Sequence, residues 1–308
     1  MPATIVLLVI IAFAGARRAE RPDPERSLES AIELGGGVIH DLQAPARRML
    51  RYSAEDEMRI GERLAAPYRS RTQRGTPGAR YLEEVGRRVA TEARRKGIRY
   101  RFGLIDGPGA NAFAICGGWI FVTAEMLDAV DSEAELAAVL GHEIAHVDLG
   151  HSAEIAWGRG MRDPRDILRL GVGIASTIAM PAYSEDVEEE ADSYGLILTV
   201  RAGYHPEAAG DLYARLAEEE LRGRRQEAGN AARRPGRGSD LSAGMRRSLQ
   251  AYRETHPPSL KRLVVLERIT AENRSAWAGK AYTLGFRNHR ERLSSVSREY
   301  PEELEVWR

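Results

Sequence analysis

The sequence predicts an α+β protein that is mainly helical, with a small antiparallel β-sheet beside a helix that carries an H-E-x-x-H motif. Three observations support this. Residues 98–104 alternate apolar and polar side chains, as a half-buried strand does. Two short apolar runs follow at 112–115 and 119–122, separated by a glycine pair that suits a tight bend. From residue 133 the pattern becomes helical and ends at Gly150, a favoured residue after a helix C-terminus.

The composition fits a soluble, helix-rich protein of one large or two small domains. The 308 residues carry 45 basic and 45 acidic side chains, so the formal net charge is zero. Such a chain has no global field that attracts polyanions, and we expect no nucleic-acid partner. The single cysteine, Cys116, excludes an intrachain disulfide. We interpret it as a small hydrophobic side chain rather than an inhibitory thiol.

The N-terminal segment is predicted to direct export. Residues 3–16 form an uncharged apolar run, which is short for a membrane span but fits the core of a signal peptide or anchor in residues 1–16. No Lys or Arg precedes the run, so both a cleaved signal and an uncleaved anchor stay open. We expect the folded domain to lie outside the cytoplasm, either periplasmic or associated with a membrane through this segment.

The rest of the chain divides into a linker, one domain and a tail. Residues 17–51 are rich in Arg, Pro and Glu and are interpreted as a linker. The domain is expected over residues 52–268, and its Arg-, Gly- and Pro-rich segment 222–242 is predicted to be a mobile loop. Residues 269–308 form a C-terminal tail that is expected to pack loosely on the domain.

The H-E-x-x-H motif consists of His142, Glu143 and His146 with two intervening residues. On a helix, residues four apart project from one face, so both imidazoles can reach one zinc ion at about 2.0–2.1 Å. Glu143 can lie beside the metal without binding it, positioned to take a proton from a metal-held water. We therefore expect one Zn²⁺ per chain.

A catalytic zinc site needs three protein ligands and one open position, so a third ligand must follow His146. His151 is a poor candidate, because five residues along a helix from His146 places it near the opposite side from His142. Glu188 is better, because it lies in the first turn of a second predicted helix. A carboxylate there completes a His/His/Glu set.

The helix that begins near Glu188 also offers a hydrogen-bond partner for one of the zinc-binding histidines. Asp192 lies four residues beyond Glu188, hence on the same helical face. It can accept the other ring N–H of a zinc-bound histidine, which fixes the tautomer. Glu189 and Glu190 are expected to point elsewhere, into solvent.

Several short motifs follow one another in order across residues 52–268. They are Asn111-Ala112-Phe113-Ala114 with Gly117-Gly118, the H-E-x-x-H with Gly150-His151, Glu188-x-x-Ala191-Asp192, Ala202-Gly203-Tyr204, and His256-Pro257-Pro258 with Arg262. In this combination the chain resembles the M48 family of zinc metallopeptidases. The resemblance implies a zincin-like fold with His142, His146 and Glu188 as ligands. It also implies Glu143 as the general base and Asp192 behind the ligands.

The resemblance also suggests a role for His256. In similar proteins the downstream histidine faces the metal, where it either stabilises the tetrahedral intermediate or caps zinc in a latent state. Its place before two prolines fits a stiff, extended segment. Arg262 could anchor that segment or help to bind the oxyanion.

We expect a zinc metalloendopeptidase that hydrolyses extended or misfolded polypeptides, with envelope protein quality control as its setting. The substrate would add as a strand along Asn111, Ala112, Phe113 and Ala114, since backbone pairing binds a peptide irrespective of its side chains. One alternative is a latent, His256-capped zinc protein that acts as a chaperone or assembly factor. Another is a zinc enzyme with a non-peptide substrate. No motif indicates an oligomeric state.

Overall fold

The computed structural model describes residues 53–158, 183–215, 252, 256 and 260–307. The predicted export segment 1–16, the linker 17–51 and the loop 222–242 lie outside these described residues. Among the helices that are described, none has both the length and the apolar character needed to cross a membrane.

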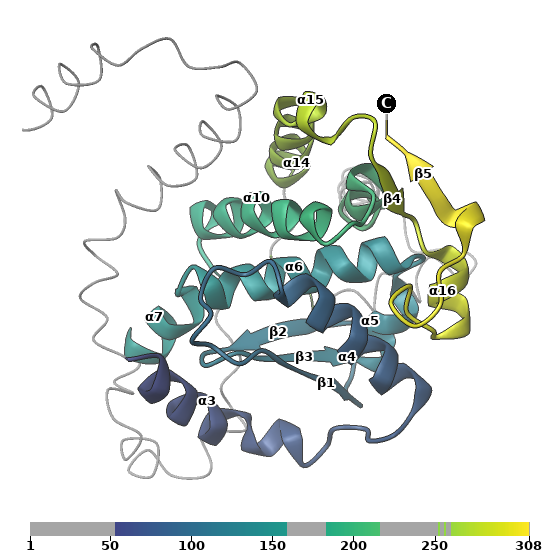
Figure 1. Ribbon diagram of the computed structural model, residues 1–308. Helices are drawn as coiled ribbons and strands as arrows, with labels where there is room; N and C mark the ends of the chain where they lie inside the picture. The colour runs from purple at the N-terminus through teal and green to yellow at the C-terminus, as the bar shows by residue number, and fades with distance from the viewer. Residues whose placement is uncertain (1–52, 159–182, 216–251, 253–255, 257–259, 308) are drawn as a thin grey trace, which may run out of the picture. The chain divides into compact units, whose positions relative to one another are not determined.

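Helices dominate the described chain, which confirms the mainly helical α+β class (Figure 1). A further helix begins at residue 206 and is described as far as residue 215. The named helices are α3 (Ala54–Arg69), α4 (Pro77–Ala90), α5 (Ala124–Ala129), α6 (Glu133–Asp148), α7 (His151–Gly158), α10 (Glu185–Arg201), α14 (Leu260–Glu272), α15 (Arg274–Trp277) and α16 (Phe286–Glu291). The strands are β1 (Arg101–Ile105), β2 (Ala112–Ile115), β3 (Trp119–Thr123), β4 (Ala281–Thr283) and β5 (Leu304–Val306).

The three-stranded sheet has the order β1-β3-β2. β2 and β3 form the expected antiparallel pair, and the bend between them uses positive φ angles of 79° at Gly117 and 93° at Gly118. β1 pairs with β3 in parallel, so this sheet is mixed rather than antiparallel throughout. The strand order explains this. β3 is the central strand, and it has the antiparallel β2 on one side and β1, which runs in the same direction as β3, on the other. The second sheet, β4 with β5, is antiparallel.

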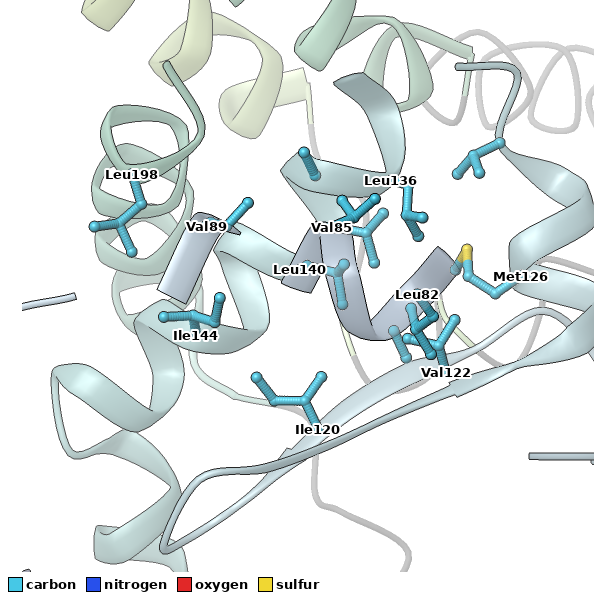
Figure 2. Close-up of a cluster of buried hydrophobic side chains, with 14 of the residues drawn as sticks. Leu82, Val85, Val89, Ile120, Val122, Met126, Leu136, Leu140, Ile144 and Leu198 are labelled. Carbon is cyan, nitrogen blue, oxygen red and sulfur yellow. The ribbon is translucent and has the colours of Figure 1, made fainter. Parts of the chain in front are cut away.

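Helix α6, which carries the H-E-x-x-H motif, lies at the centre of the domain. All 16 of its residues are buried, and the helix is apolar on nearly every side outside the motif, as expected for a core helix. Figure 2 shows side chains of α6 itself together with side chains of α4, β3, α5 and α10 in one apolar cluster. Burial of each large aliphatic side chain contributes about 1.5–3 kcal/mol. The labelled members are Leu82, Val85 and Val89 of α4, Ile120 and Val122 of β3, Met126 of α5, Leu136, Leu140 and Ile144 of α6, and Leu198 of α10.

α6 and α10 approach each other closely at a pair of glycines. A Cβ atom on Gly141 would lie 2.7 Å from the carbonyl oxygen of Gly195, and one on Gly195 would lie 2.8 Å from the backbone nitrogen of His142. Thr199 lies in the same contact and donates to the carbonyl oxygens of Ala137, at 3.2 Å, and Gly195, at 2.8 Å. Because Gly141 and Gly195 have no Cβ atom, the two helices that carry the predicted ligands can pack at this close distance.

Replacing Gly195 by alanine should force these helices apart. We expect Gly195→Ala to lower the free energy of unfolding by about 1–3 kcal/mol, as overpacking does in a well-filled core, and to weaken zinc binding. Gly210→Ala is the matched control, because a Cβ at Gly210 meets nothing within 4 Å. Urea unfolding and zinc titration of both variants test this. Equal behaviour of the two variants would contradict the close-packing argument.

Residues 284–295 pack on the N-terminal end of α6. The backbone nitrogen of Glu133 donates to the carbonyl oxygen of Gly285 at 3.1 Å, so the C-terminal chain satisfies a donor that the helix itself leaves unpaired. The buried Glu133 carboxylate accepts hydrogen bonds from the Ser295 hydroxyl at 2.5 Å and the Tyr204 hydroxyl at 3.0 Å. The domain boundary predicted at residue 268 falls inside α14.

Candidate metal centre

Four side chains converge beside α6. His142 and His146 come from that helix, Glu188 comes from the first turn of α10, and His256 precedes α14. All four are at most 2% exposed, and their candidate ligand atoms lie within 4.8 Å of one another. The helical spacing of the two α6 histidines thus places both rings on one face, as the sequence predicted.

The ligand atoms are spaced as a tetrahedral zinc centre requires. With bonds of about 2.0–2.1 Å, neighbouring ligand atoms of a tetrahedron lie about 3.3–3.4 Å apart. The Nε2 atoms of His142 and His146 are 3.0 Å apart, and His142 Nε2 lies 3.2 Å from His256 Nδ1. The Glu188 carboxylate lies 3.1 Å from His256 Nδ1, 3.4 Å from His142 Nε2 and 3.5 Å from His146 Nε2.

The chemistry of this donor set also fits a cation. His142 Nδ1 lies 2.9 Å from Asp192 Oδ1, so in the neutral imidazole, the form that binds a metal, the ring proton sits on Nδ1 and Nε2 presents a bare lone pair. That lone pair faces another imidazole nitrogen and a carboxylate, an arrangement that repels unless a positive charge fills the space between them. The residues therefore fit one Zn²⁺, for which imidazole and carboxylate are common ligands.

Arg262 supports the cluster from behind. Its Nε and Nη2 atoms donate to the two carboxylate oxygens of Asp192, each at 2.7 Å, which is a bidentate ion pair. Its Nη1 lies 3.0 Å from Glu188 Oε2 and donates to the carbonyl oxygen of His256 at 3.4 Å. Of the two roles considered for Arg262, these contacts favour anchoring of the His256 segment.

Neighbouring imidazole and guanidinium groups keep the carboxylates of Glu188 and Asp192 ionised. Burial alone would raise the pKa of Glu188, but the imidazoles of His256 and His142 hold it well below its usual range. Burial acts in the same way on Asp192, and Arg262 lowers its pKa. Burial lowers the pKa of His142, but the negative charges of Glu188 and Asp192 outweigh this and raise it to about 9. The site is thus built to stabilise positive charge.

Glu143 lies beside the cluster without belonging to it. The side chain is fully buried, and its Oε1 lies 3.3 Å from His256 Nε2. Neither carboxylate oxygen makes a hydrogen bond to any of the described residues. Burial raises the pKa of this carboxyl, partly offset by His256 and His142. An acceptor with free lone pairs and a raised pKa is what a general base requires.

His256 occupies the place of a fourth ligand. Its Nδ1 lies among the other ligand atoms, while the rings of Tyr252 and His142 flank it with centroids 4.8 and 4.9 Å away. A catalytic zinc site keeps its fourth position for water or substrate. The described conformation is therefore a closed arrangement of the cluster.

Comparison with known families places this site in a known class. Residues 78–270, more than half of the chain, match the model of "Peptidase family M48". The chain belongs to peptidase family M48. The matched segment contains the H-E-x-x-H helix, the acidic turn of α10 and His256. The family assignment confirms the resemblance drawn from the sequence and makes this domain a metallopeptidase domain.

Several relatives are themselves named as proteases. The mitochondrial metalloendopeptidase OMA1 of Schizosaccharomyces pombe is 28% identical over 200 residues, covering 62% of this chain and 52% of the relative. The beta-barrel assembly-enhancing protease of Yersinia pestis is 27% identical over 158 residues, 45% of this chain and 32% of the relative. The human mitochondrial metalloendopeptidase OMA1 is 33% identical over 124 residues, 34% and 24% respectively. The chain thus spans about half or less of the length of these relatives.

His151 and Glu190 lie closer to the cluster of His142, His146, Glu188 and His256 than the sequence suggested. Glu190 was expected in solvent, but its side chain is only 14% exposed and lies 3.3 Å from His151 Nε2. His151 Nδ1 lies 3.0 Å from His146 Nδ1, so this histidine stands behind a ligand. Helical periodicity alone placed His151 on the far side of α6, but the helix ends before Gly150, as predicted, and the positive φ of 87° at that glycine turns the chain into α7.

Two further residues, Cys116 and Tyr183, bear on the interpretation of the sequence. Cys116 is 1% exposed in an apolar cluster with Ile60 and Phe113, and burial raises its thiol pKa, so it packs as a small hydrophobic side chain. Tyr183 had no signal in the sequence. Its ring stacks on His146 with centroids 3.9 Å apart and an interplanar angle of 12°.

The predicted substrate strand, β2, lies at an edge of the three-stranded sheet. Thr123 N donates to Asn111 O at 2.9 Å, so the alternating ladder directs the backbone groups of Ala112 and Ala114 away from β3. Within the part of the chain that the structure describes, no other strand pairs with this side of β2. The Phe113 side chain is buried against Tyr68 and Phe121.

Proposed function

We propose that this M48 protein is a zinc-dependent endopeptidase that hydrolyses peptide bonds in extended or misfolded polypeptides. One observation carries the proposal: a complete His/His/Glu ligand set lies next to a buried carboxylate, Glu143, that makes no hydrogen bond to the described residues. A site that only stored zinc would have no use for such a carboxylate. A non-peptide substrate is less well supported, because the named relatives are proteases.

His142, His146 and Glu188 would hold the metal. When bound, zinc lowers the pKa of its water to about 7 and polarises a carbonyl oxygen. Glu143 would take a proton from the attacking water as the water oxygen adds to the peptide carbonyl carbon. It would then pass this proton to the amine nitrogen as the C–N bond breaks. Asp192 and Arg262 keep His142 in the tautomer whose Nε2 faces the metal.

The substrate is proposed to lie along β2. Its backbone would pair with the outward-facing groups of Ala112 and Ala114, with Phe113 in the same strand and Asn111 immediately before it. Main-chain pairing gives affinity without selecting side chains, which suits extended, partly unfolded polypeptides.

Metal removal tests the proposed activity. Incubation with a strong chelator should abolish casein cleavage by the purified full-length protein, and stoichiometric zinc should restore it. The metal-free protein should also unfold at a lower temperature, because a ligand that binds only the folded state stabilises it. Cleavage that persists in fully zinc-depleted protein would contradict the proposal.

The position of His256 supports a second candidate, a latent zinc protein that acts as a chaperone or assembly factor. A histidine that caps the metal reduces the competent fraction of molecules, and activity falls in proportion. We expect His256→Ala to keep zinc through the three remaining ligands and to raise casein cleavage roughly tenfold or more. A fall in cleavage would instead assign His256 to catalysis. Bound zinc with no cleavage by wild type or variant would favour the assembly factor.

We further propose an envelope location, with residues 1–16 as signal or anchor and quality control as the setting. The apolar run in the sequence and the name of the Yersinia relative, which refers to β-barrel assembly, support this. Fractionation of cells that produce the tagged full-length chain tests it, and a purely cytoplasmic distribution would contradict it.

A further inference from the structure

A buried imidazole stands behind the second histidine of the motif. α6 ends at Asp148, Gly150 turns the chain, and His151 opens α7 directly beside His146. The two Nδ1 atoms are 3.0 Å apart, and His151 is 1% exposed. On its other side, His151 Nε2 lies 3.3 Å from the Glu190 carboxylate. Three side chains thus form a line that ends at a candidate metal ligand.

The hydrogen positions along this line follow from the ligand role of His146. Two imidazole nitrogens at hydrogen-bond distance need one hydrogen between them. If His146 binds metal through Nε2, its hydrogen sits on Nδ1 and is donated to His151 Nδ1. His151 must then carry its own hydrogen on Nε2, which is the atom that faces Glu190. Each ring has one tautomer, and the acceptor at the end of the line is a carboxylate.

The two metal-binding histidines are therefore supported in different ways. His142 donates directly to Asp192, a carboxylate that Arg262 binds on both oxygens. His146 reaches its carboxylate through an intervening imidazole. Its ring plane is further held by Tyr183, which stacks on it at 3.9 Å.

We propose that His151 and Glu190 are positioning residues for the metal ligand His146, acting through its Nδ1. This inference rests on the proposed zinc site. The hydrogen bond from His146 to His151 fixes the ring orientation that aims Nε2 at the metal, and the Glu190 carboxylate increases the basicity of both rings. Partners of this kind, one step behind a metal ligand, typically change metal affinity by about 10–100-fold when they are lost.

Four variants of the full-length protein test the proposal, with zinc affinity measured by competition against a chromogenic chelator. His151→Phe keeps a planar ring but removes both nitrogens, and should weaken zinc binding by about 10–100-fold. His151→Asn places an acceptor oxygen where Nδ1 stood and should bind zinc more tightly than the phenylalanine variant. Glu190→Gln should weaken binding by less than His151→Phe. Glu189→Gln, which removes the same charge one residue away, should bind zinc as the wild type does.

Cobalt substitution supplies a second readout that a purely structural role would not change. The visible absorption bands of bound Co²⁺ report ligand geometry, so we expect them to shift in His151→Phe and to return towards the wild-type spectrum in His151→Asn. The unfolding temperature of each metal-free variant separates loss of fold from loss of ligand orientation. Wild-type zinc affinity and an unchanged cobalt spectrum in His151→Phe would overturn the inference. Absence of zinc from the wild-type protein would instead overturn the proposed function, and this inference with it.

Discussion

Glu143→Gln should retain zinc and lose peptide hydrolysis by about 10²–10⁴-fold, the usual contribution of a general base. The amide has the shape of the carboxylate but cannot take a proton from the attacking water. Zinc binding should survive, because Glu143 is not among the converging ligand atoms. Cleavage of a fluorogenic peptide and metal analysis of the same preparation provide the two measurements.

The exposed Glu125 supplies the control for this prediction. Glu125→Gln makes the same chemical change on α5, away from the candidate ligands, and should leave both cleavage and zinc content unchanged. If Glu143→Gln cleaved the peptide at the wild-type rate, Glu143 would not be the base and the mechanism would be wrong. Loss of zinc from that variant would mean that Glu143 binds metal or shapes the ligands.

Arg262→Met should lower the free energy of unfolding by about 3–5 kcal/mol, as removal of one partner from a buried ion pair does. Arg262 is 3% exposed and contacts the carboxylates of both Asp192 and Glu188. Methionine fills similar space but leaves two buried negative charges without their cation. Urea unfolding of metal-free protein at neutral pH measures the loss.

A surface pair provides the comparison for Arg262. Arg287 pairs with Glu291 at 2.8 Å, but the two side chains are 39% and 34% exposed. Arg287→Met should therefore lower the free energy of unfolding by at most about 1 kcal/mol.

The contribution of the buried Arg262–Asp192 pair to stability should also depend on pH. Arg262 lowers the pKa of Asp192 against the effect of burial, so this stabilisation is present above the usual carboxyl range and is lost as pH falls through the lowered pKa. Equal losses of unfolding free energy in Arg262→Met and Arg287→Met would contradict the role of Arg262 as a buried anchor.

The placement of site residues that lie on the same helix could be predicted from the sequence, because helical periodicity determines which residues share a face. The four-residue spacings of His142 with His146, and of Glu188 with Asp192, place each pair on one face wherever the helices pack. Asp192 was accordingly expected behind a ligand, and the structure places it 2.9 Å from His142 Nδ1. The order of motifs, through the family resemblance, supplied the expectation that the two helices meet.

Features that depend on contacts distant in sequence were not predictable in the same way. Gly150 marked the end of the helix in the sequence but not the direction of the chain beyond it, and the turn at its positive φ angle places His151 beside His146. The parallel pairing of β1 with β3 depends on strand order, which a period of two does not specify. Gly195 gives no local signal of the helix contact that it permits.

Metal analysis of the purified full-length protein tests the central claim most directly. We predict about one zinc per chain by inductively coupled plasma mass spectrometry, as a single His/His/Glu centre requires. The His142→Ala variant, prepared in parallel, should contain little or none, while its fold is checked by circular dichroism. A wild-type protein that takes up no zinc under these conditions, or a His142→Ala variant that keeps a full equivalent, would contradict the assignment of this cluster as the metal centre.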